Sequence, residues 1–121
     1  MAKIPKHCIK KFKEHYTSYP SILSIPDLNI NDDINKFFSK SRIVWREEHI
    51  DSDGVINTTH KLIDYDSSGV MIFISKSPTI YNTGNVYILT TEARMDVAKL
   101  TISRLNKIKN GNNSGTTKRE N

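Results

Sequence analysis

The most constraining feature of this 121-residue sequence is a change of pattern at residue 42, where the spacing of apolar residues turns from helical to alternating. The segments Arg42–Ile50 and Val55–Tyr65 are rich in β-branched and aromatic residues. They flank Asp51-Ser52-Asp53-Gly54, a compact turn sequence in which Gly54 can adopt a positive φ. The sequence therefore predicts a β-hairpin in the middle of the chain.

The register of this hairpin decides which side chains share a face. We expect Ile50 opposite Val55, which places Trp45 opposite His60 and Ile43 opposite Leu62. The predicted apolar face carries Ile43, Trp45, Ile56 and Leu62. The predicted polar face carries Arg46, Glu48, Asn57, Thr59 and Lys61. Because side chains alternate along a strand, a slip of one residue would exchange the two faces.

A helix is predicted near the start of the chain. Apolar residues recur at helical spacing from Cys8 to Tyr16, after Pro5, which suits the first position of a helix. We expect this helix over about residues 6–17. Its lysines fall on or near the side opposite the apolar residues and form an outward basic surface: Lys6, Lys10, Lys11 and Lys13.

Two further segments connect this helix to the hairpin. Residues 19–26 are bracketed by prolines and predict an extended connector laid over the core. Asn31 or Asp32 can cap a short helix that runs through about Ser39, with acidic residues favourably placed in its first turn.

Two more strands and a final helix follow the hairpin. Val70–Ser75 is a continuous apolar run, and Val86–Leu89 is again strand-like, with turns expected at 64–69 and 82–85 and a short fifth piece possible at 79–81. Thr90 or Thr91 can cap the final helix. Its expected core residues are Ala93, Val97, Ala98, Leu100, Ile102, Leu105 and Ile108.

These elements predict an α+β fold with N-terminal helices, a four-stranded antiparallel meander and a C-terminal helix packed on the sheet. We expect one domain over residues 1–110, because a chain of this length makes one compact unit. Residues 111–121 contain no apolar side chain and predict a disordered polar tail.

The positive charge is concentrated at both ends of the chain. The formal net charge is +5, and residues 1–20 and 91–121 each contribute +4, whereas residues 21–60 contribute −3. If the two terminal segments pack side by side, their fields add and attract a polyanion, most simply a nucleic acid. We therefore expect a small nucleic-acid-binding module that holds phosphates on a basic surface. Solvated lysine side chains without any ligand are the simpler interpretation.

Two kinds of residue are candidates for this interface. Cations neutralise phosphates, and exposed aromatic rings stack on the bases of single strands. The candidate cations are Lys10, Lys11, Lys13, Arg46, Lys61, Arg94, Lys99 and Lys107. The candidate stacking residues are Trp45, Tyr81 and Tyr87, for which the alternative role is core packing.

The stretch Glu92-Ala93-Arg94-Met95-Asp96-Val97-Ala98-Lys99-Leu100-Thr101 resembles the closing helix of double-stranded-RNA-binding domains. That helix carries a Glu-Ala-Lys and then an Ala-Ala-Lys-Leu-Ala pattern after a three-stranded sheet. In that family, basic residues at the start of the helix contact phosphate, and the resemblance implies this role for Arg94. Thr90 and Thr91 stand where the family has lysines. The expected order of elements is also similar to single-strand-binding coactivators and to the Alu-binding subunits of the signal recognition particle.

RNA is thus somewhat favoured as the partner, with single-stranded DNA as the other possibility. The alternative function is a protein-interaction module, either a subunit of a complex or a small inhibitor. Such a module would act through the hairpin edge or the proline-bracketed connector, because exposed sheet edges invite strand addition or a homodimer.

Other classes of protein are not expected from this sequence. No apolar run approaches the roughly 18 to 20 residues that span a bilayer. Nucleophile-elbow, Walker and zinc-protease motifs are all missing from the sequence, so we expect no enzyme. The single Cys8 and four dispersed histidines do not suggest a disulfide, a metal site or a cofactor. We expect an intracellular protein, cytoplasmic or nuclear.

Overall fold

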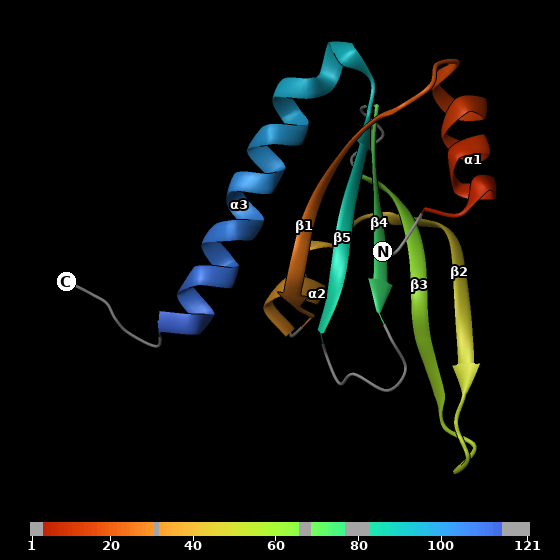
Figure 1. Cartoon of the computed structure of the whole chain (residues 1–121), viewed down its shortest axis with the longest axis vertical. Coiled ribbons are helices and arrows are strands. Elements are labelled where there is room, and N and C mark those ends of the chain that lie inside the picture. Colours follow the sequence, from red (N-terminus) through yellow and green to blue (C-terminus); the bar gives the residue numbers. More distant parts are fainter. Residues whose placement is uncertain (1–3, 31, 66–68, 77–82, 115–121) are drawn as a thin grey trace.

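A computed structural model shows a five-stranded antiparallel sheet with helices on both faces (Figure 1). It describes residues 4–30, 32–65, 69–76 and 83–114. In chain order the elements are α1 (Lys6–Tyr16), β1 (Ser21–Asn29), α2 (Asp32–Phe37), β2 (Arg42–Ile50), β3 (Ile56–Tyr65), β4 (Val70–Lys76), β5 (Thr83–Thr90), the 3-10 turn η1 (Glu92–Arg94) and α3 (Met95–Ser114). The predicted α+β class, with a C-terminal helix packed on an antiparallel sheet, is confirmed.

The strand order in the sheet is β1-β5-β4-β3-β2. Strands β2 to β5 form an antiparallel meander, and β1 pairs with β5 at the far edge. The chain therefore crosses from one edge of the sheet to the other between β1 and β2, and α2 lies on this crossing (Figure 1).

The extra strand, β1, is the segment that we expected to be a connector. Ser21 to Ile25 pair with β5 in regular register, with Leu23 and Ile25 directed toward the core. Pro26 falls where the register shifts, between Ile25 and Leu28. An edge strand tolerates this proline because only one of its sides needs backbone donors. The sheet therefore has five strands, and the prediction of four was wrong because it left out β1.

Strand β5 also begins earlier than expected. Residues 83–85, predicted as part of a turn, pair with neighbouring strands, and Gly84 lies between Leu28 and Lys76. A Cβ atom on Gly84 would lie 2.7 Å from the carbonyl oxygen of Ser75, so a glycine lets the two strands approach closely. The fifth piece suggested at 79–81 lies outside the described residues.

The predicted hairpin is present, but its predicted register is wrong. Ile50 pairs with Ile56, since Asp51 N–H donates to the carbonyl of Val55 and closes a longer loop. The Asp51 carboxylate also accepts a hydrogen bond of 2.9 Å from Val55 N–H. Two irregularities in β2 shift the register again, one of them between Ile43 and Trp45.

The irregularity between Ile43 and Trp45 places these two residues on opposite faces of the sheet, in contrast to the predicted common face. Ile43 pairs with Ile63, whose side chain packs with α3, whereas Trp45 pairs with Leu62, whose side chain packs with α1. Arg46 lies opposite Lys61 and shares its face, as expected for these two polar residues.

Each face of the sheet has its own apolar core. The core under α2 and α3 contains residues of β1, β3, β4 and β5: Ile25, Leu28, Ile63, Val70, Ile72, Ile74, Val86 and Ile88, together with Ile30, Ile34, Phe38, Ala98 and Leu105. The core under α1 contains Cys8, Phe12, Leu62, Met71, Phe73 and Leu89. Helices α1 and α3, the described helices of the two basic terminal segments, therefore lie on opposite faces of the sheet and do not pack side by side.

Helix α3 follows η1, for which Thr91 is in the N-cap position without a side-chain hydrogen bond. Most of the expected core residues of this helix are packed, but Ala93 and Leu100 are exposed. The helix reaches Ser114, four residues into the segment expected to be a tail, and residues 115–121 lie outside the described part. Among the described helices, none has the length and apolar character required to cross a membrane.

Candidate nucleic-acid interface

A row of exposed lysines runs along the solvent side of α1. Lys6, Lys10 and Lys13 are four and three residues apart, so they project from one side of the helix. Within the described part of the chain, none of the three makes an ion pair. Lys11 is partly buried and lies beside the row rather than in it. This lysine row is a positive surface without an ion-pair partner among the described residues.

An exposed aromatic ring lies beside one end of the lysine row. Helix α1 ends where Thr17 adopts a left-handed conformation with φ of 52°, and the chain then turns toward β1. Tyr19, in this turn, is 70% exposed, and the ammonium group of Lys13 lies 5.4 Å from the centre of its ring. A cation over one side of the ring leaves the other side open to solvent or to a planar ligand.

Helix α1 is fixed to the sheet by its inner side. Phe12 and Cys8 are fully buried, and burial raises the pKa of the Cys8 thiol to about 11. A thiol with this pKa is protonated at neutral pH, which makes it a packing residue and a poor nucleophile. At the end of the helix, the Tyr16 hydroxyl donates a hydrogen bond of 2.5 Å to the buried carboxylate of Asp64. These contacts hold the lysine row in a fixed orientation.

The remaining predicted cations do not join this surface. Arg46 forms an ion pair of 3.5 Å with Glu48. Lys99 and Lys107 are exposed on α3, across the sheet from α1. Arg94, the last residue of η1, packs over Gly69, where an added Cβ would lie 2.8 Å from its Cγ. The structure thus gathers Lys10, Lys11 and Lys13 and separates the other five cations from them.

The predicted stacking residues serve the core where they are described. Trp45 is partly buried between His7, at a ring distance of 4.4 Å, and Phe73, at 6.4 Å. Tyr87 is also partly buried and contacts the ring of Phe73. Tyr81 lies outside the described residues. The exposed ring of Tyr19 is thus the better stacking surface.

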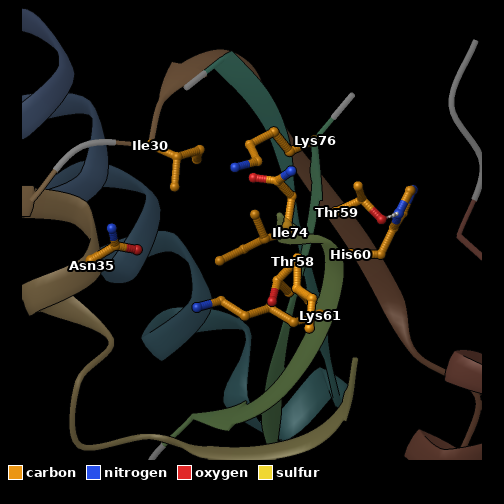
Figure 2. A pocket seen from close by; sticks show the side chains of 10 residues that line it. Ile30, Asn35, Thr58, Thr59, His60, Lys61, Ile74 and Lys76 are labelled. Atoms are coloured by element: carbon orange, nitrogen blue, oxygen red, sulfur yellow. Dashed lines mark hydrogen bonds between the residues drawn. The ribbon is translucent and has the colours of Figure 1, made fainter. Parts of the chain in front are cut away.

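Lys61 lies in a pocket bounded by α2 and by β3 and β4 (Figure 2). The pocket has a volume of about 240 Å³, and Lys76 and Asn35 also line it. Burial lowers the pKa of Lys61, and the positive charge of Lys76 lowers it further. The two lysines therefore form a second positive site, on the sheet face opposite α1.

Comparison with protein-family models, with curated proteins and with solved structures finds no match to this chain. The described residues contain no group of three or more His, Cys, Asp or Glu side chains suitable for holding a metal ion.

Four residues of these sites are not among the site residues predicted from the sequence: Lys6, Tyr19, Asn35 and Lys76. Tyr19 belongs to the connector that we expected to lie over the core. In the structure its ring is exposed, after the left-handed residue Thr17 has ended α1. Lys76 was missed because its place in the pocket, near Asn35 of α2 and Lys61 of β3, depends on the strand order. The signal available in the sequence was that Lys76 directly follows the apolar run Val70–Ser75.

Proposed function

We propose that this protein binds single-stranded nucleic acid, RNA or DNA, along the outer side of α1. The observation that carries the proposal is the exposed ring of Tyr19 beside the lysine row of Lys6, Lys10 and Lys13. Cations and an exposed aromatic ring are the two components that sequence-tolerant single-strand binding needs.

In this mechanism the lysine row holds phosphates, and one base stacks on the open side of Tyr19. A helix rises about 1.5 Å per residue, so the row is about 10 Å long. It matches about three stacked nucleotides at about 3.4 Å each. Binding is electrostatic and has little sequence specificity, because neither contact distinguishes one base from another.

Single strands are preferred to duplexes because a base inside a helix has both of its faces covered by its neighbours. A tyrosine ring can stack only on a base that is unpaired or at a strand end. The stacking contribution is about 1–3 kcal/mol per base. We therefore expect Tyr19→Ala to weaken single-strand binding while leaving the weaker duplex binding almost unchanged.

The test is a set of fluorescence anisotropy titrations with labelled single-stranded RNA, single-stranded DNA and double-stranded RNA. Each is measured at about 50 and 200 mM salt, since contacts to several phosphates weaken steeply over this range. We expect salt-dependent binding, strongest to a single strand. Absence of binding to all three probes at the lower salt concentration would reject the proposal.

A second candidate function is self-association through the hairpin. Ile50, Val55 and Ile56 at its tip are 64%, 54% and 59% exposed, and β2 is an edge strand of the sheet. An exposed edge with apolar ends favours antiparallel pairing with a second copy. Light scattering after size exclusion would then show a dimer that Ile56→Lys dissociates, and a wild-type monomer at high concentration would reject this candidate.

A further inference from the structure

The pocket between α2, β3 and β4 collects two positive charges from neighbouring strands. Lys61 of β3 and Lys76 of β4 extend their amino groups toward the side of the pocket where Asn35 of α2 lies (Figure 2). Neither lysine makes an ion pair or hydrogen bond with another described residue. The described residues that line the pocket include no acidic side chain.

This arrangement is unfavourable without a ligand. Lys61 is half-buried, and its pKa is lowered first by the loss of water around the ammonium group and then by repulsion from Lys76. A buried charge without a counterion reduces stability. A negatively charged group placed between the two lysines would offset their repulsion and accept hydrogen bonds from ammonium groups that have no such partner among the described residues.

We propose that this pocket binds a phosphate monoester, with Lys61 and Lys76 as its two cations and Asn35 as a neutral hydrogen-bond donor. A monoester carries a charge between about −1.5 and −2 at pH 7, which matches two ammonium groups. A phosphodiester carries one charge and continues as a chain on both sides, so it leaves one of the two ammonium groups without a counterion.

The size and lining of the pocket limit the rest of the ligand. Its volume of about 240 Å³ is below the range of about 300–1,000 Å³ that is usual for drug-sized ligands. Ile74, only 4% exposed, and Ile30 supply apolar contacts for the carbon atoms next to the ester oxygen. A small phosphorylated molecule or the phosphorylated end of a strand fits these limits.

The phosphate pocket and the lysine row lie on opposite faces of the sheet, so this inference does not rest on the proposed function. The variant Lys6→Gln/Lys10→Gln/Lys13→Gln should retain phosphate binding. Loss of single-strand binding and loss of phosphate binding can therefore be observed separately.

The experiment is an NMR titration of the full ¹⁵N-labelled chain with inorganic phosphate, ribose 5-phosphate and a 5′-phosphorylated oligonucleotide. We expect saturable chemical-shift changes at the amides of Asn35, Lys61 and Lys76 with monoesters. The probe that binds with the highest affinity identifies the source of the phosphate. Dimethyl phosphate, a diester with one charge, should bind at least about tenfold more weakly, as expected when one charge-assisted hydrogen bond is lost.

Matched variants distinguish phosphate binding in the pocket from attraction to general surface charge. Lys61→Met and Lys76→Met should each weaken phosphate binding by at least about tenfold, whereas Lys99→Met on α3 should have no effect. Lys61→Met should also keep or raise the melting temperature, because it removes a half-buried charge. Unsaturable shifts, equal binding of dimethyl phosphate, or equal effects of all three variants would overturn the proposal.

Discussion

The hydroxyl group of Tyr16 donates a hydrogen bond of 2.5 Å to Oδ1 of Asp64, 48 residues further along the chain. This bond joins the end of α1 to strand β3. Arg42 of β2 forms an ion pair with the same carboxylate, and its guanidinium lies 3.3 Å from Oδ2. The buried Asp64 thus receives two donors, and the Tyr16 bond fixes the end of α1 that carries Lys13 and leads into the turn with Tyr19.

Replacing Tyr16 by Phe should destabilise the protein by about 1–3 kcal/mol, since a buried carboxylate then loses a donor that water does not replace. The measurement is urea unfolding followed by circular dichroism. Tyr19→Phe is the matched control, because the ring of Tyr19 is exposed. Equal stabilities of the two variants would show that the Tyr16–Asp64 bond has no net effect on folding.

The same tyrosine makes stability sensitive to alkaline pH. Burial, and secondarily the hydrogen bond to Asp64, raises the pKa of Tyr16 from 10.0 to about 12. The folded state therefore holds this proton more tightly than the unfolded state, so the contribution to stability is complete below pH 10 and is lost as the pH rises toward 12. The free energies of unfolding of the wild type and of Tyr16→Phe should therefore converge as the pH rises from 9 to 12. Parallel curves would contradict the assignment.

Gly84 should be difficult to replace. An alanine Cβ would lie 2.7 Å from the Ser75 carbonyl oxygen, which belongs to the neighbouring strand and cannot move independently. We expect Gly84→Ala to cost about 1–3 kcal/mol through displacement of β4 from β5. Gly54→Ala, at a φ of 83° but with open space around it, should cost only about 1 kcal/mol. Thermal unfolding of both variants provides the comparison, and a stable Gly84→Ala protein would refute the close approach.

Cys8 should report whether α1 stays on the sheet. It is the single cysteine of the chain, its side chain is fully buried and its pKa is raised to about 11. Alkylation by iodoacetamide at pH 8 should therefore be slow in the folded protein and fast in urea. Rapid alkylation without denaturant would mean that α1 leaves the sheet readily, and the lysine row would then have no fixed geometry.

Local features of this fold were readable from the sequence. The helix near residues 6–17 and the hairpin were predictable because their apolar spacing and turn residues act over a few positions. The register of the hairpin was not, because its loop extends to Val55. The irregularity between Ile43 and Trp45 also leaves no sequence signal comparable to a glycine or proline. The role of residues 21–29 as a strand depended on a long-range partner, β5, that no local pattern specifies.

The candidate interface was predictable to a smaller extent. Helical spacing correctly placed Lys10 and Lys13 on the outer side of α1. Charge per segment could not tell that α1 and α3 lie on opposite faces, because that depends on which core each helix covers. The same difficulty affected Trp45, whose burial results from contact with His7 of α1 and Phe73 of β4.

The most direct measurement is the salt dependence of single-stranded RNA binding for two variants of equal charge. One carries Lys6→Gln, Lys10→Gln and Lys13→Gln on α1, and the other carries Lys99→Gln, Arg104→Gln and Lys107→Gln on α3. Each phosphate contact contributes about 0.7 to the slope of log K against log salt for single strands. We predict that the α1 variant loses about 2 units of slope, and that the α3 variant retains the wild-type slope. Equal slopes for the two variants would contradict binding along α1.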